Sequence, residues 1–215
     1  EFQCSRDAFL YFIRYFSISY LGAFICLIAS GYWTILAAIL TSFGCIMAIC
    51  EFVFYKEFVD PFFKKTDGYN ISGTIEPSGE VQQSIIISGH YDSPHVFRFL
   101  NKNQKLYKFR IGLTLFLYFF ITAISLWASY VWLTQPTSFT INQFLNFIMG
   151  GGLILMLQYF FFVSWDVSPG AGDNLISAAM ALRLADHFSN LNLIHTRLIF
   201  LCPDAEESGL RGARE

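Results

Sequence analysis

Four long apolar runs constrain the fold of this chain more than any other feature of its 215-residue sequence. They cover residues 9–28, 33–55, 111–133 and 141–165. The last two hold no Asp, Glu, Lys or Arg. A helix needs about 20 consecutive apolar residues to cross the hydrocarbon core of a bilayer. The runs therefore predict a transmembrane hairpin within residues 1–55 and a second, inserted hairpin within residues 111–165, four spanning helices in all.

The composition agrees with a chain that faces lipid over part of its surface. Hydrophobic residues make up 54% of the sequence and charged residues 14%, whereas soluble domains average about 45–50% and about 25%. The net charge of −2 argues against a nucleic-acid partner. The five cysteines form no Cys-x-x-Cys pair, so we interpret them as buried hydrophobic residues rather than as disulfide or zinc-knuckle cysteines.

Two polar segments, 56–110 and 166–215, have the pattern of an α/β domain. Residues 69–75 alternate like a strand, and the apolar residues 84–88 predict a fully buried strand. A helix is predicted from Asp173 to about Asn190, followed by a strand around 197–201. The expected apolar face of that helix contains Ile176, Ala179, Met180, Leu182 and Leu184. We therefore expect a mixed sheet flanked by helices, an α/β sandwich built from two separate parts of the chain.

The distribution of basic residues predicts on which side of the membrane these segments lie. Segment 56–110 holds eight of them: Lys56, Lys64, Lys65, Arg98, Lys102, Lys105, Lys108 and Arg110. The connections at 29–32 and 134–140 hold none. The positive-inside rule then places the polar segments, and the N-terminus with Arg6 and Arg14, in the cytoplasm. The alternative is that these charges belong to the folded domain and do not report orientation.

Chemically competent residues follow three of these elements. His90-Tyr91-Asp92 follows the strand at 84–88, Asp173 lies among glycines before the helix, and Asp204-Ala205-Glu206-Glu207 follows the last strand. Adjacent glutamates raise each other's pKa, and a metal ion removes that cost. A histidine ligand is commonly oriented by a nearby carboxylate. Taken singly, each motif has a plain alternative: a capped strand end, a helix N-cap or a solvated acidic turn.

In this order and on this frame, the three motifs resemble those of the zinc-dependent aminopeptidases with paired co-catalytic metals, peptidase family M28. That family also includes glutamate carboxypeptidase and the glutaminyl cyclases. The resemblance covers residues 69–95 and 166–215 and leaves the apolar runs outside it. The family also has an acidic and a histidine ligand downstream of the Glu-Glu pair, so the resemblance implies that residues 1–215 lack the C-terminal part of the catalytic domain.

The resemblance implies a role for each motif residue. His90 would bind one zinc ion, Asp173 would bridge two, and Glu207 would bind the other. Glu206 would be the general base that takes a proton from a water molecule activated by the metals, and Asp92 would orient the site from behind the ligands.

The expected function is a membrane-bound zinc metallopeptidase of the aminopeptidase type. Two zinc ions are expected in the full-length protein, with peptide substrates and the lipid bilayer as its partners. One alternative is acyl transfer of the glutaminyl cyclase type on the same fold. Another is a non-catalytic membrane receptor or scaffold. The first reading is favoured because every motif position present carries a chemically competent residue.

Overall fold

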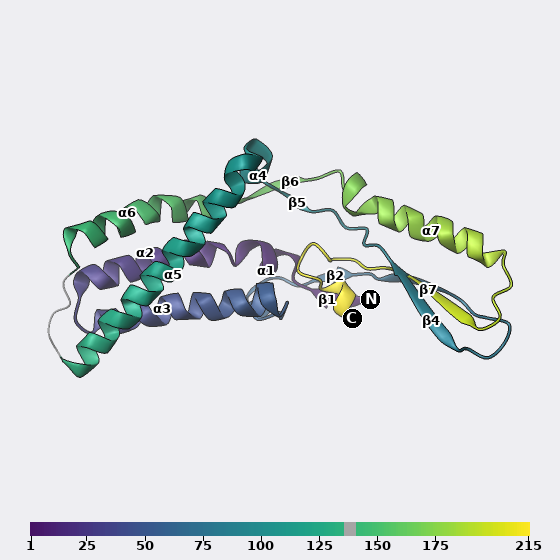
Figure 1. The fold of residues 1–215 in the computed structure, drawn as a ribbon, viewed down its shortest axis with the longest axis horizontal. Coiled ribbons are helices and arrows are strands. Elements are labelled where there is room, and N and C mark those ends of the chain that lie inside the picture. The colour runs from purple at the N-terminus through teal and green to yellow at the C-terminus, as the bar shows by residue number, and fades with distance from the viewer. Residues whose placement is uncertain (136–140) are drawn as a thin grey trace. The chain divides into compact units, whose positions relative to one another are not determined.

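The structure of the protein is a computed structural model that describes residues 1–135 and 141–215 (Figure 1). The polar turn expected around 135–138 lies almost wholly outside the described residues. The chain folds into two compact units that alternate along the sequence. Unit 1 comprises Glu1–Phe9, Asp60–His95 and Trp165–Glu215, and unit 2 comprises Leu10–Val59 and Val96–Ser164.

A three-stranded sheet forms the centre of unit 1. Its order is β3 (Ile71–Ile75), β7 (Thr196–Cys202) and β4 (Gln83–Ser88). The β3 strand is antiparallel to β7, whereas β4 is parallel to it, with Ser88 opposite Leu201. Because β4 and β7 are parallel, their carboxyl ends lie at the same edge of the sheet, and the motifs that follow the two strands begin side by side.

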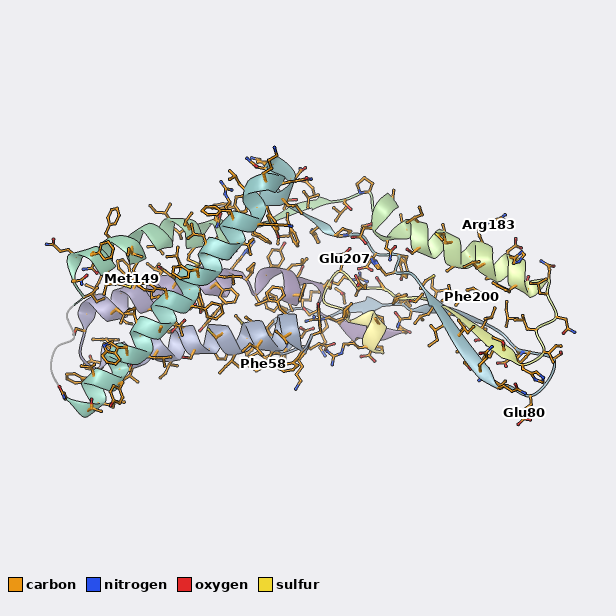
Figure 2. The ribbon with its side chains drawn as sticks, in the orientation of Figure 1. Phe58, Glu80, Met149, Arg183, Phe200 and Glu207 are labelled. Atoms are coloured by element: carbon orange, nitrogen blue, oxygen red, sulfur yellow. The ribbon has the colours of Figure 1, made fainter. Side chains whose placement is uncertain are left out.

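One face of this sheet packs against α7 (Ile176–Ser189), which runs alongside β4 and β7 in Figure 1. The core consists of Ala181 on the helix with Leu198 and Phe200 on β7, and Ile87 and Phe188 pack around it. Figure 2 shows Arg183 on the side of α7 that points away from the sheet. The sandwich is thus a sheet with a helix layer on one face in the described residues, and it agrees with the mixed α/β class that the sequence predicts.

The prediction for the apolar face of α7 is wrong. Ile176, Met180, Leu182 and Leu184 are exposed, and the buried residues are the alanines at 178 and 181. Small side chains let the helix backbone approach the sheet closely, so the helix turns its alanine stripe inward and leaves its larger residues outside. Hydrophobicity alone favoured the larger residues, whereas packing distance decided the orientation.

The prediction that residues 84–88 form a fully buried strand is also wrong. β4 is an edge strand, covered by α7 on one face only, and its Ile86 is 63% exposed while Ile87 packs on the core. A continuous apolar run is typical of a strand buried on both faces, but here the second face is open among the described residues.

Two short ladders complete the strands. β1 (Phe2–Cys4) pairs antiparallel with β2 (Thr66–Gly68), which joins the N-terminal segment to the segment that follows Asp60. β5 (His95–Phe97) pairs with β6 (Val163–Val167). Figure 1 marks both chain ends close to β1 and β2.

Unit 2 is helical. Its principal elements are α2 (Arg14–Ala29), α3 (Trp33–Ala48) continued by the π-helical turn η1 (Ile49–Val53), α4 (Arg98–Lys102), α5 (Gln104–Thr134), and α6 (Gln143–Leu157) continued by η3 (Gln158–Phe161). Hydroxyl groups bridge these helices: Tyr20 donates to the Met149 carbonyl at 3.1 Å, and Ser129 donates to the Thr34 carbonyl at 2.7 Å.

Three helices of unit 2 are long and apolar enough to cross a membrane, namely Trp33–Val53, Gln104–Thr134 and Gln143–Phe161. This corrects the predicted four. The first apolar run is divided, because α1 (Arg6–Tyr11) ends before α2 begins and the amide of Tyr15 bonds to the carbonyl of Phe12 across a tight turn. The 16 residues of α2 extend over about 24 Å at 1.5 Å per residue, less than the roughly 30 Å of a hydrocarbon core.

Candidate metal centre

The site begins where β4 meets the N-terminus of α7. Gly89 follows β4, and a Cβ atom at this position would lie 2.6 Å from the backbone carbon of Ser177. The strand end therefore rests directly on the helix backbone, a contact that only glycine allows. This close approach brings His90 to the segment before α7, where its Nε2 atom lies 3.6 Å from Oδ1 of Asp173.

The loop that follows β7, residues 203–212, supplies the two glutamates and is called the glutamate loop below. Figure 2 labels Glu207 within it. The loop folds back on itself, since the amides of Gly209 and Leu210 both donate to the carbonyl of Glu206, at 3.0 and 2.8 Å. Ala205 and Leu210 adopt positive φ angles of 52° and 61°, which cost energy for residues with a Cβ atom. The reversal places Oε2 of Glu206 3.4 Å from Nε2 of His90.

Asp92 joins the two halves of the site. Its Oδ1 lies 3.3 Å from Nδ1 of His90. The same carboxylate accepts hydrogen bonds from the backbone amides of Glu206, at 3.2 Å, and Glu207, at 3.0 Å. One side chain thus fixes both the imidazole ring and the backbone of the glutamate pair, the arrangement by which residues behind a metal site orient its ligands.

His90, Asp173 and Glu207 form a cluster that could hold a metal ion. Each offers one ligand atom, and these atoms all lie within 4.8 Å of one another. His90 is buried, whereas the Asp173 side chain is 75% exposed, so the cluster opens to solvent on the Asp173 side. One imidazole nitrogen and two carboxylate oxygens are ligands that zinc accepts, with bonds of about 2.0–2.2 Å.

The electrostatics of the cluster also fit a cation. Burial raises the pKa of Glu207 to about 7, and the neighbouring carboxylates of Asp173 and Glu206 add to the effect. Burial likewise raises the pKa of Glu206, which His90 lowers in part. Like charges held together in this way are stabilised by a positive ion, which reverses the shifts. The donor set and its charge therefore fit zinc.

The structure brings together all five residues that the sequence singled out: His90, Asp92, Asp173, Glu206 and Glu207. Sequence reasoning missed the residues that anchor the glutamate loop, which are Arg6, Asp60, Asn70 and Arg211. The available signal was that Arg6 and Asp60 are charged residues next to apolar runs, and that Arg211 lies only four residues after Glu207.

A comparison with known protein families finds a match, and it covers the segment that contains Asp173 and the two glutamates. Residues 162–215 match the model of the family described as Peptidase family M28. This segment of the chain is similar to peptidase family M28. The matched residues include Asp173 and both glutamates, while His90 and Asp92 lie outside the match and reach the site through the fold. No curated protein and no solved structure matches the chain. The match indicates a hydrolase of the peptidase type.

Proposed function

We propose that this protein is a member of peptidase family M28, a membrane-anchored, zinc-dependent metallopeptidase that acts as an aminopeptidase. The observation that carries the proposal is the cluster of His90, Asp173 and Glu207, whose ligand atoms lie within 4.8 Å of one another beside a further glutamate that is not needed as a ligand. A site with a ligand set and an adjacent carboxylate is the arrangement that metal-assisted hydrolysis requires.

Each residue has a role that follows from its position. His90, Asp173 and Glu207 would hold zinc, and the exposed Asp173 would also reach a second ion. Zinc would supply Lewis-acid activation of the peptide carbonyl and of the attacking water. Glu206 would take the proton from that water and pass it to the leaving amine, since its Oε2 lies 3.4 Å from Nε2 of His90, beside the cluster, and burial raises its pKa. Asp92 would hold the His90 ring in place.

Membrane anchoring rests on the long apolar helices α5 and α6 of unit 2, which lie between His90 and Asp173 in the sequence. The third long helix, α3, cannot cross by itself, because the β1–β2 ladder joins residues that precede α2 to residues that follow α3. An even number of crossings returns the chain to the side from which it left, so both residues can share one site. The basic residues of segment 56–110 favour the cytoplasmic side for unit 1.

The catalytic proposal is tested with the purified full-length protein in detergent, by measuring bound zinc and the hydrolysis of aminoacyl anilides and dipeptides. Glu206→Gln should abolish hydrolysis and leave zinc in place, because it removes a base and no ligand. Glu207→Ala should lose zinc as well, whereas Glu76→Gln, on the opposite end of the sheet, should change neither. Hydrolysis by Glu206→Gln within tenfold of wild type would remove Glu206 from this role.

The same experiment separates the alternatives. A protein that binds zinc and cyclises N-terminal glutamine, but leaves anilides intact, would be an acyltransferase. A protein with zinc and neither activity would be a scaffold.

The topology is tested by cysteine labelling in a variant whose natural cysteines are replaced. Single cysteines at Ser78 in unit 1 and at Thr134, the C-terminal end of α5, should react from opposite sides of sealed vesicles. Reaction of both from one side would overturn the membrane assignment of α5.

A further inference from the structure

The glutamate loop after β7 is held from outside by two ion pairs. Arg6 forms a two-pronged pair with the carboxylate of Asp204, at 3.0 and 2.5 Å. Arg211 forms a second two-pronged pair with Asp60, at 3.3 and 2.5 Å. Asp204 and Arg211 belong to the loop that carries Glu206 and Glu207, whereas Arg6 and Asp60 come from distant parts of the chain. Two-pronged pairs fix direction as well as distance.

The first pair acts on the start of the loop. The Asp204 carboxylate, besides binding Arg6, accepts hydrogen bonds from the amides of Tyr69 and Ala205, at 3.2 and 2.8 Å. Burial raises the pKa of Asp204, but these bonds, above all the one from Arg6, lower it more, and the net pKa lies below the ordinary value. Asp204 is therefore an anion fixed on three sides directly before Ala205, the residue with φ of 52°.

The second pair acts on the end of the loop. Arg211 is fully buried and Asp60 is 3% exposed in their side chains. The Arg211 guanidinium also donates to the carbonyl of Gly209 at 3.2 Å and lies 5.6 Å from the centre of the Phe9 ring. The Arg211 amide in turn donates to the carbonyl of Ala205 at 3.1 Å. The pair thus closes the loop around the two glutamates.

Arg6 and Asp60, the partners of the loop, lie in the two segments of unit 1 that flank the first helical part of unit 2. The chain leaves unit 1 after Phe9 and returns to it at Asp60. The two flanking segments are joined to each other by the β1–β2 ladder, in which Phe2 faces Gly68 and Cys4 faces Thr66. The ladder therefore joins the two chain segments that contact the loop, one through Arg6 and Phe9 and the other through Asp60.

We propose that Arg6 and Asp60 are positioning residues for the reaction, which fix the loop of Glu206 and Glu207 through Asp204 and Arg211. The proposal rests on the function proposed above. A loop with two non-glycine residues at positive φ persists only where its surroundings hold it. On the metal side Asp92 holds the amides of Glu206 and Glu207, and the two ion pairs hold the loop at its start and its end. Displacement of a catalytic group by about 1 Å can lower the rate by about 100-fold, so loosening the anchors should be measurable.

The principal test compares Arg6→Met, which removes the guanidinium fork, with Arg6→Lys, which keeps the charge and loses the fork. Arg197→Met is the matched control, because Arg197 pairs with Glu76 on the surface of the same sheet, with side chains 39% and 58% exposed. We expect Arg6→Met to lower kcat by about 10- to 100-fold with KM within about twofold, Arg6→Lys to recover part of kcat, and the control to match wild type.

The second pair needs a different variant, since removing Asp60 alone leaves the Arg211 charge buried and could unfold the protein. Asp60→Leu/Arg211→Met removes both charges and keeps apolar volume, an exchange that proteins often tolerate. We expect a folded protein with kcat reduced by about 10-fold or more, and a changed visible absorption spectrum when cobalt replaces zinc.

Two readouts independent of turnover distinguish this proposal from the proposed function. Hydrogen exchange of residues 203–212 should be faster in Arg6→Met and in the double variant than in Arg197→Met. If wild type hydrolyses no peptide, the proposed function fails, and the exchange and cobalt measurements still decide whether the loop is anchored. Turnover, spectrum and exchange equal to the control in both variants would overturn the positioning role.

Discussion

The two units of this chain satisfy their buried polar groups in opposite ways. In unit 1 the buried polar groups that shape the site are ionisable and paired with each other: His90 with Asp92, Asp204 with Arg6, and Arg211 with Asp60. In unit 2 they are chiefly hydroxyls that bond to each other and to backbone carbonyls. Among the residues that the structure describes there, Glu51 is the only buried charged side chain, and it accepts the amide of Val59 at 3.0 Å.

The difference has a physical reason. A buried ion pair is tolerated where its geometry is good and further hydrogen bonds complete it, and losing one partner is then costly. A hydroxyl that bonds to a helix carbonyl costs little to bury and little to lose. The charged network defines one arrangement of the site in unit 1, whereas the hydroxyls of unit 2 let helices pack without charges in a segment suited to lipid.

The comparison predicts its largest effect at Asp60. Asp60→Asn leaves the buried Arg211 guanidinium without its counter-charge and should lower the free energy of unfolding by about 3–5 kcal/mol. Glu76→Gln breaks the exposed pair with Arg197 and should cost less than about 1 kcal/mol. Chemical unfolding in detergent measures both. Equal effects of the two substitutions would show that burial of the pair does not matter.

In unit 2 the sensitive property is packing rather than charge. A Cβ atom at Gly44 in α3 would lie 2.0 Å from the Tyr118 hydroxyl, whereas one at Gly112 in α5 would meet nothing within 4 Å. We expect Gly44→Ala to destabilise the protein by about 1–3 kcal/mol. Gly112→Ala should be neutral or stabilise by up to about 1 kcal/mol. Thermal unfolding in micelles would compare them, and an unaffected Gly44→Ala variant would disprove the close helix contact.

The zinc affinity and the stability of unit 1 should also depend on pH through Glu207. Its pKa of about 7 results from burial and from the carboxylates of Asp173 and Glu206. Metal ligands must be deprotonated, so this group should weaken zinc binding by about tenfold for each pH unit below 7. Without zinc, Glu207 makes the stability of the fold decrease as the pH rises. A raised pKa stabilises the fold below the ordinary value of 4.5, and this contribution is lost as the pH rises through about 7.

Thermal unfolding with zinc and with a chelator, between about pH 5 and pH 8, measures the two contributions together. The stabilisation by zinc should grow with pH over this range. In the chelator series, Glu207→Gln should show less loss of stability with rising pH than wild type, and an identical slope would contradict the assigned pKa.

The smallest effect is expected for a single hydroxyl of unit 2. The Tyr118 hydroxyl bonds to Ser19 at 2.8 Å and to the Thr41 carbonyl at 3.3 Å. Tyr118→Phe should cost about 0.6 kcal/mol, the average for such bonds between membrane helices. A loss as large as that of Asp60→Asn would erase the distinction between the units, since it would mean that hydroxyls and charges define the fold to the same degree.

By itself, the sequence determined the α/β class of unit 1 and the residues of its candidate site. Runs of spanning length, the strand and helix periods and three short motifs predicted a mixed α/β unit with an apolar helical part, and they identified the five residues that meet at the candidate centre. These signals are local, because hydrophobic periodicity and residue type act over a few neighbours. The similarity to peptidase family M28 can be detected from sequence for the same reason, because the matched residues 162–215 hold two of the motifs within one continuous segment.

Tertiary structure alone decided the properties that depend on distant partners. The alanine stripe of α7 faces the sheet because a helix packs at the distance its smallest side chains allow, and the larger residues on its other side carried the stronger sequence signal. The first apolar run is divided at Phe12. Arg6 and Asp60 reach the glutamate loop across 198 and 151 residues. An ion pair depends on distance in space, so no period or motif in the sequence could have shown that these charges hold the loop.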